Sequence, residues 1–193
     1  MYKCFFVRFP LCSGNIKLYS PYLMDHESNP DMPLLADGKI VFFKTKNSAI
    51  NFMHNHFRNV SYTDEPAYEF DTETFIKNVR TGYQRGIVID ILNIIFDYLS
   101  AIKIENYPFF SRKIISDFAD YTTFHRDLEI YFQSHSQPAP SELINFLYWF
   151  SGEIAHHSIL CSQRTLSEII QGKMRLSPPR GDNLSLNDQS KNF

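Results

Sequence analysis

The chain has 193 residues, of which 44 % are apolar and 16 % aromatic, with only 7 glycines and 10 prolines. This composition supplies enough apolar surface for a buried core and excludes a disordered or fibrous chain. A net charge of −2, from 19 basic and 21 acidic residues, lacks the basic excess that is typical of duplex-binding proteins. Three cysteines are too few for a disulfide framework, which favours a reducing compartment.

Strands are predicted near the N-terminus, where aromatic and β-branched residues dominate three short runs. The runs are residues 2–9, 16–19 and 39–43. The turn signal Asp37-Gly38 precedes the third run, and a long connection with three prolines, residues 20–36, precedes that turn. From Ala49 onward the apolar residues recur at helical spacing behind two candidate caps, Thr45 and Asn47, which predicts a helix that packs on the strands.

The remainder of the chain is predicted to be mostly helical. The expected helices are residues 71–79 with Asp71 as cap, 87–102, 111–132, 142–150 with Ser141 as cap, and a last one from about residue 162 or 165 to Gly172. Strands first and helices afterwards predict an α+β fold, in which a small N-terminal antiparallel sheet of about three strands packs on a mainly helical remainder.

The distribution of aromatic residues predicts the domain organisation. All but one of the thirty aromatic residues lie in residues 1–150, so we expect an aromatic-rich core there, with residues 151–172 as a helical appendage of the same domain. Residues 173–193 contain too few apolar side chains to offset the entropy of ordering, and we expect a flexible tail.

No segment is typical of a membrane span or a signal peptide. The most apolar window, residues 86–102, contains two carboxylates, and Arg8 and Pro10 interrupt the apolar N-terminal stretch. We therefore expect a cytoplasmic protein with no membrane partner.

Polar residues recur on the helix predicted at 87–102. Asp90, Asn93, Asp97 and Ser100 stand at i, i+3, i+7 and i+10, so they form one narrow stripe among apolar neighbours. Two interpretations remain open. The stripe is either the edge along which a central helix touches water, or a surface that meets Lys, Arg or backbone donors of a partner.

A second acidic feature lies just before this helix. Five carboxylates fall within ten residues without a base among them: Asp64, Glu65, Glu69, Asp71 and Glu73. They are either a solvated linker with acids at a helix N-terminus, or a surface that attracts a basic partner and raises its association rate.

Catalytic and metal sites are not predicted. Glu153, His156 and His157 could share a divalent ion, but two or three ligands do not make a zinc site, and we expect surface histidines. The chain contains no G-x-S-x-G, P-loop, Rossmann glycines or C-x-x-C, so we expect no enzyme, no cofactor and no metal. A metal enzyme centred on these three residues remains a third class of function.

The segment from Glu153 to His157, followed by residues 162–173, resembles the helix-turn-helix of phage-repressor-type regulators. The resemblance implies a DNA-binding transcriptional regulator with this motif around residues 152–173. It would present Gln163, Arg164 and Thr165 to base edges in the major groove. The segment departs from the pattern at His156 and Leu160, where a small residue and the turn glycine are expected.

Three stretches resemble bacterial toxin-immunity proteins of the contact-dependent growth-inhibition and polymorphic-toxin type: residues 37–52, 70–75 and 92–100, within a loosely similar region of residues 37–100. The resemblance implies a non-enzymatic, cytoplasmic protein that binds and neutralises a cognate toxin domain, for example a nuclease, through a surface complementary to a basic one. The residues expected to bind this partner are Glu65, Glu69, Asp71, Glu73, Asp90, Asn93 and Asp97.

Overall fold

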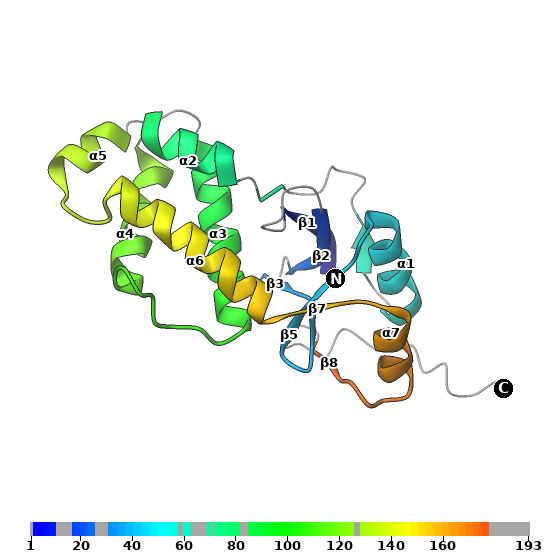
Figure 1. Ribbon diagram of the computed structural model, residues 1–193. Coiled ribbons are helices and arrows are strands. Elements are labelled where there is room, and N and C mark those ends of the chain that lie inside the picture. Colours follow the sequence, from blue (N-terminus) through cyan, green and yellow to red (C-terminus); the bar gives the residue numbers. More distant parts are fainter. Residues whose placement is uncertain are drawn as a thin grey trace. The chain divides into compact units, whose positions relative to one another are not determined.

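The computed structural model describes residues 2–10, 17–25, 31–57, 60–62, 69–70, 72–81, 85–125 and 128–177. The chain divides into two compact units (Figure 1). Met1–Phe70 and His157–Phe193 form the first, here called the strand unit, and Asp71–His156 form the second, here called the helical unit. The strands lie together in the first unit and the second unit is helical, which confirms the α+β class.

This division differs from the predicted one. The expected boundary after residue 150 is wrong, because residues 157–177 belong with the N-terminal strands rather than forming a helical appendage. Residues 176–177, predicted as part of the tail, pair as a strand, and residues 178–193 of that tail lie outside the described residues.

The first sheet of the strand unit has the order β3-β2-β1-β6. Its strands are β1 (Tyr2–Pro10), β2 (Lys17–Asp25), β3 (Met32–Pro33) and β6 (Val60–Tyr62). β1 and β2 are antiparallel along their whole length, and β1 and β6 are parallel. β2 continues through Pro21 into the predicted connection, because the Pro21 carbonyl still accepts a hydrogen bond from the Leu34 amide at 2.9 Å.

The second sheet has the order β7-β5-β4-β8. Its strands are β4 (Leu35–Ala36), β5 (Lys39–Phe42), β7 (Ser158–Leu160) and β8 (Leu176–Ser177). Asp37 and Gly38 join β4 to β5 with φ angles of 48° and 75°, the conformation of a type I′ hairpin turn, so the predicted turn is confirmed. The Asp37 carboxylate also accepts a hydrogen bond from the Arg175 amide at 2.9 Å, which ties the turn to the segment before β8.

Two helices pack beside these strands (Figure 1). α1 (Lys46–His56) begins at the predicted cap, since the Thr45 hydroxyl accepts a hydrogen bond from the Ser48 amide at 3.1 Å. α7 (Gln163–Ile170) packs Leu166 and Ile169 against the same core. That core combines side chains from β1, β2, β5 and α1: Cys4, Phe6, Leu23, Leu34, Ala36, Val41, Phe43, Ala49, Phe52, Met53 and Phe57.

The helical unit contains α2 (Thr72–Thr81), α3 (Arg85–Ala101), α4 (Arg112–Phe124), α5 (Leu128–Ser134) and α6 (Pro140–His156). The predicted helix 111–132 is two helices, because α4 ends at Phe124. In its last turns the hydroxyls of Thr122 and Thr123 both donate to the Ala119 carbonyl, which is the kind of local bonding that competes with a helix.

The start of α6 lies two residues before the predicted start at residue 142. Pro140 occupies the first helical position, where its missing N–H costs no hydrogen bond. The Ala139 amide donates to Oε2 of Glu142 at 2.8 Å, as in one half of a capping box. Ser141 is therefore inside the first turn and is not the cap.

Candidate partner-binding surface

The polar stripe predicted on α3 forms the exposed edge of that helix. Asp90, Asn93 and Ser100 are exposed, and Asp97 is half-buried. The intervening positions are mostly buried, among them Val88, Ile91, Leu92, Ile95, Tyr98 and Leu99. The helical spacing thus places one carboxylate-rich edge on an otherwise core-forming helix.

The charge of the chain is unevenly divided between the two units. The helical unit has eleven acidic and seven basic residues, a formal charge of −4, whereas the strand unit has ten acidic and twelve basic residues, a formal charge of +2. Partial desolvation by its apolar neighbours raises the pKa of Asp90. The exposed edge of α3 is therefore an acidic surface on an acidic unit.

Glu69, a member of the predicted acidic cluster, is paired with basic residues of the same chain. Its carboxylate accepts hydrogen bonds from Arg8 and from Lys17, the latter at 2.9 Å. The hydrogen bond from Lys17, with the additional bond and charge of Arg8, lowers the pKa of Glu69 despite its partial desolvation. Glu69 thereby joins residues 69–70 to β1 and to the start of β2, and it lies in the strand unit.

Of the other members of the acidic cluster, some lie among the described residues and some do not. Glu73 is exposed in the first turn of α2, where a carboxylate interacts favourably with the helix N-terminus. Glu65 and Asp71 lie outside the described residues. Among the described members of the cluster, only Glu73 therefore lies in the helical unit with Asp90, Asn93 and Asp97.

An aromatic cluster lies beside the α3 edge. Phe96 of α3, Tyr107 of the α3–α4 connection and Trp149 of α6 are half-buried, and Tyr107 is stacked or tilted against the other two at centroid distances of 6.4 and 6.0 Å. Beneath them the fully buried Phe146 lies 5.2 Å from Tyr107 and 5.6 Å from Trp149. Burial raises the pKa of Tyr107, although the charge of Arg112 partly opposes the rise.

Sequence reasoning missed this cluster, because it assigned the aromatic residues of positions 1–150 to the core. The available signal was the neighbouring pair Tyr148 and Trp149. Helical spacing directs Phe146, Leu147 and Phe150 inward, and Tyr148 is 59 % exposed. Phe96 stands directly before Asp97 and between Asn93 and Ser100 on the helix surface, so the aromatic cluster and the polar edge adjoin.

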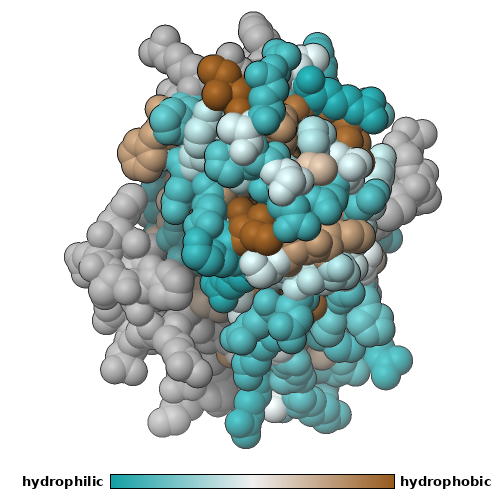
Figure 2. All heavy atoms as spheres, turned by 90° about the vertical axis from the view of Figure 1, so that its left-hand side faces the viewer, coloured by the Kyte–Doolittle hydropathy of each residue, from teal (hydrophilic) through white to brown (hydrophobic). Residues whose placement is uncertain are grey.

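A different set of apolar side chains lies at the α4–α5 end of the helical unit. Phe124 is 78 % exposed and Ile130 is 55 % exposed. Figure 2 shows the face that carries α5, on which hydrophobic residues form separate spots among hydrophilic ones rather than one continuous patch. The described residues of this face therefore do not form the contiguous apolar area typical of a large hydrophobic interface.

The predicted helix-turn-helix at 152–173 is wrong in its geometry. Between α6 and α7 lies the strand β7, which pairs in parallel with β5, and not a turn of three or four residues. The two helices also belong to different units. DNA binding itself stays a prediction.

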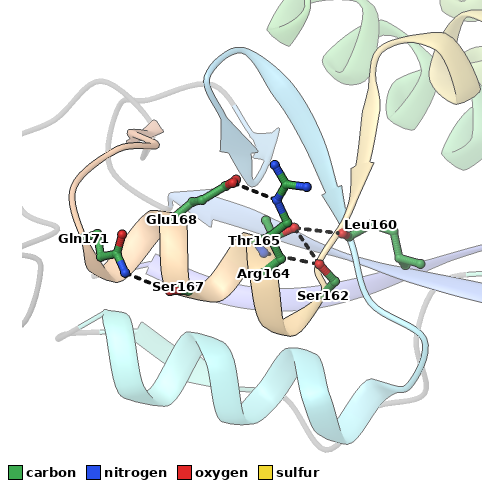
Figure 3. Close-up of polar contacts among 7 residues, drawn as sticks. All are labelled: Leu160, Ser162, Arg164, Thr165, Ser167, Glu168 and Gln171. Atoms are coloured by element: carbon green, nitrogen blue, oxygen red, sulfur yellow. Dashed lines mark hydrogen bonds and ion pairs between the residues drawn. The ribbon is translucent and has the colours of Figure 1, made fainter.

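Figure 3 shows why Thr165 is not placed to read bases. Its side chain is only 5 % exposed, and its hydroxyl lies 3.0 Å from Oγ of Ser162 and donates to the Leu160 carbonyl at 3.3 Å. Ser162 is the cap of α7, so of the two predicted starts of this helix the one near residue 162 is confirmed and the one at residue 165 is wrong. Arg164 is exposed and pairs with Glu168, four residues on, at 3.1 Å.

Histidine and cysteine side chains are the groups that would supply metal ligands or a nucleophile. Among the residues that the structure describes, no three His, Cys, Asp or Glu side chains gather into a group that could hold a metal ion. Burial raises the pKa of Cys4 to about 12 and that of Cys161 to about 11, so both thiols stay protonated at neutral pH. Within the same described ranges, no helix combines the length and apolarity needed to cross a membrane.

Similarity to known proteins does not add to this description. No protein-family model, no curated protein and no solved structure matches the chain.

Proposed function

We propose that the protein is an immunity protein that binds a basic surface of a cognate toxin domain and neutralises it. The observation that carries the proposal is the exposed edge of α3, where Asp90, Asn93 and Asp97 stand together on a unit with a formal charge of −4. The sequence resemblance over residues 37–100 supports the same function.

The mechanism is binding and occlusion, without a chemical step. Carboxylates on an exposed edge attract a basic partner over roughly a Debye length, about 10 Å at 0.1 M salt, and this attraction raises the association rate. Apolar and aromatic contacts then determine how slowly the complex dissociates. Glu73 lies in the same acidic unit as the α3 edge, whereas Glu65 and Asp71 lie outside the described residues and stay predictions.

Glu69 has a different role in this proposal. Its carboxylate is held by Arg8 and Lys17, and reversal of its charge would place three cations together and disturb the strand unit. A test of partner binding therefore uses the α3 edge and leaves Glu69 unchanged.

The test compares two matched charge reversals in the helical unit. Asp90 lies on the α3 edge and Asp120 on α4, and both are exposed. The reading frames that neighbour the gene are first searched for a toxin domain, which then serves as the partner, and stopped-flow association is the measurement. We expect Asp90→Lys to lower the association rate about tenfold at low salt and to reduce its salt dependence, and Asp120→Lys to change both much less.

Protection of cells that express the toxin domain is the second readout. We expect Asp90→Lys to weaken protection and Asp120→Lys to preserve it. If Asp90→Lys associates and protects like the parent, the α3 edge is not the partner-binding surface. If the parent itself does not bind the toxin domain, the proposed function is wrong.

A further inference from the structure

The aromatic cluster is a preformed surface feature built from three separate segments. Tyr107 packs between Phe96 of α3 and Trp149 of α6, and Trp149 stacks on Phe146 with an interplanar angle of 26°. Phe110 packs against Phe146 at 5.2 Å, and both are buried. The half-exposed rings thus stand on a rigid buried base, which limits the entropy that they lose on binding.

The chemistry around these rings favours a cationic ligand. The faces of Trp and Tyr rings attract cations, and a guanidinium can also stack on them as a planar group. Glu153 stands one helical turn after Trp149, so both side chains lie on the same face of α6, and Asp97 neighbours Phe96 on the adjoining face of α3. Carboxylates therefore accompany the rings on both helices.

Basic residues near the aromatic cluster limit the direction from which a cationic ligand can approach it. Arg112, at the start of α4, is close enough to Tyr107 to affect its ionisation, and Lys103 lies in the same α3–α4 connection. Figure 1 shows this connection running from the end of α3 to α4. A cationic side chain would meet less repulsion from the side of Asp97 and Asn93 than from the side of Arg112.

We propose that the cluster of Phe96, Tyr107 and Trp149 binds an arginine side chain presented by a basic segment of the partner protein. The guanidinium packs on the Trp149 and Tyr107 rings, and the carboxylate of Asp97 attracts the charge. This inference rests on the proposed function for the identity of the partner, whereas its chemistry is testable with a peptide.

Trp149 is the one tryptophan of the chain, so its fluorescence reports binding at the aromatic cluster. The full chain is titrated at low salt with an octa-arginine peptide and with an octa-citrulline peptide, in which a neutral urea group replaces each guanidinium. We expect the arginine peptide to change Trp149 emission saturably and the citrulline peptide to leave it unchanged. Binding of octa-arginine in a calorimeter without a change in emission, or no binding at all, overturns the proposal.

Matched variants test the residues. We expect Asp97→Asn to raise the dissociation constant for octa-arginine about threefold to tenfold, and Asp120→Asn, an exposed acid on α4, to leave it near the parent value. By calorimetry, Trp149→Leu should weaken binding about tenfold and Trp149→Phe should weaken it less, since a ring remains. Equal weakening by Asp97→Asn and Asp120→Asn contradicts the site, as does full affinity in a folded Trp149→Leu protein.

Titration with the toxin domain separates the two proposals. A toxin domain that binds tightly without altering Trp149 emission overturns the arginine site and leaves the proposed function standing. An arginine peptide that binds at Trp149, together with a toxin domain that does not bind, overturns the proposed function and leaves the arginine site standing.

Discussion

Single carboxylates of the acidic regions have distinct roles, although the sequence predicts the same partner-binding role for all of them. Glu69 is 38 % exposed and bridges Arg8 and Lys17, whereas Asp90 lies on the exposed edge of a helix and has its pKa raised by desolvation. Composition alone does not distinguish the two carboxylates. The difference depends on whether a base from a distant strand faces the acid.

We expect Glu69→Gln to destabilise the strand unit by less than about 1 kcal/mol at pH 7, because the ion pairs are partly exposed. The folded state lowers the pKa of Glu69, so its contribution to stability is present above the carboxyl's unfolded pKa and is lost as pH falls through the folded pKa. Urea unfolding should therefore separate the variant from the parent at pH 7, and the difference should vanish in acid below the folded pKa. Glu105→Gln, at an exposed acid in the α3–α4 connection, is the control.

Secondary-structure elements were predicted correctly where the sequence signals that define them, such as caps and turn residues, are local. Thr45, one of the two predicted candidates, caps α1, α4 begins next to the predicted start at residue 111, and Asp37-Gly38 forms the expected turn. Elements that depend on distant partners were missed. β7 separates α6 from α7 because its backbone pairs with β5, more than a hundred residues earlier, which no helical periodicity reveals.

The position of α7 also bears on the DNA-binding alternative. Leu166 and Ile169 face the core of the strand unit, Thr165 is buried, and Arg164 is paired with Glu168, which leaves few side chains of this helix available to bases. We expect no salt-dependent gel shift of duplex DNA at low ionic strength. A shift that Arg164→Ala abolishes, but that Lys113→Ala on α4 does not, would instead support a DNA-binding regulator.

At the scale of the whole molecule, the chain leaves the strand unit after Phe70 and returns to it at His157. β7 and β8 add strands to the sheet that the Asp37-Gly38 hairpin begins, and α7 covers part of the core around Phe52 and Met53. The strand unit is therefore completed only when the last described segment has been added.

We expect substitutions in α7 to destabilise the strand unit selectively. Leu166→Ala together with Ile169→Ala removes partly buried side chains and should cost about 2–4 kcal/mol. Amide hydrogen exchange should show reduced protection in β5 and α1 and parental protection in α3, because each unit has its own core. Equal loss of protection in α3 would show that the two units unfold together.

The sequence by itself determined the α+β class, the first turns of α1 and α4, the β4–β5 turn and the polar edge of α3. The caps, the turn and the edge depend on residues close together in the chain, and the class depends on the order of the elements along it. The tertiary structure decided that residues 157–177 complete the N-terminal sheets, that Glu69 binds Arg8 and Lys17, and that Phe96, Tyr107 and Trp149 form one cluster. These features join segments far apart in the chain, and only packing and backbone pairing determine which distant side chains meet.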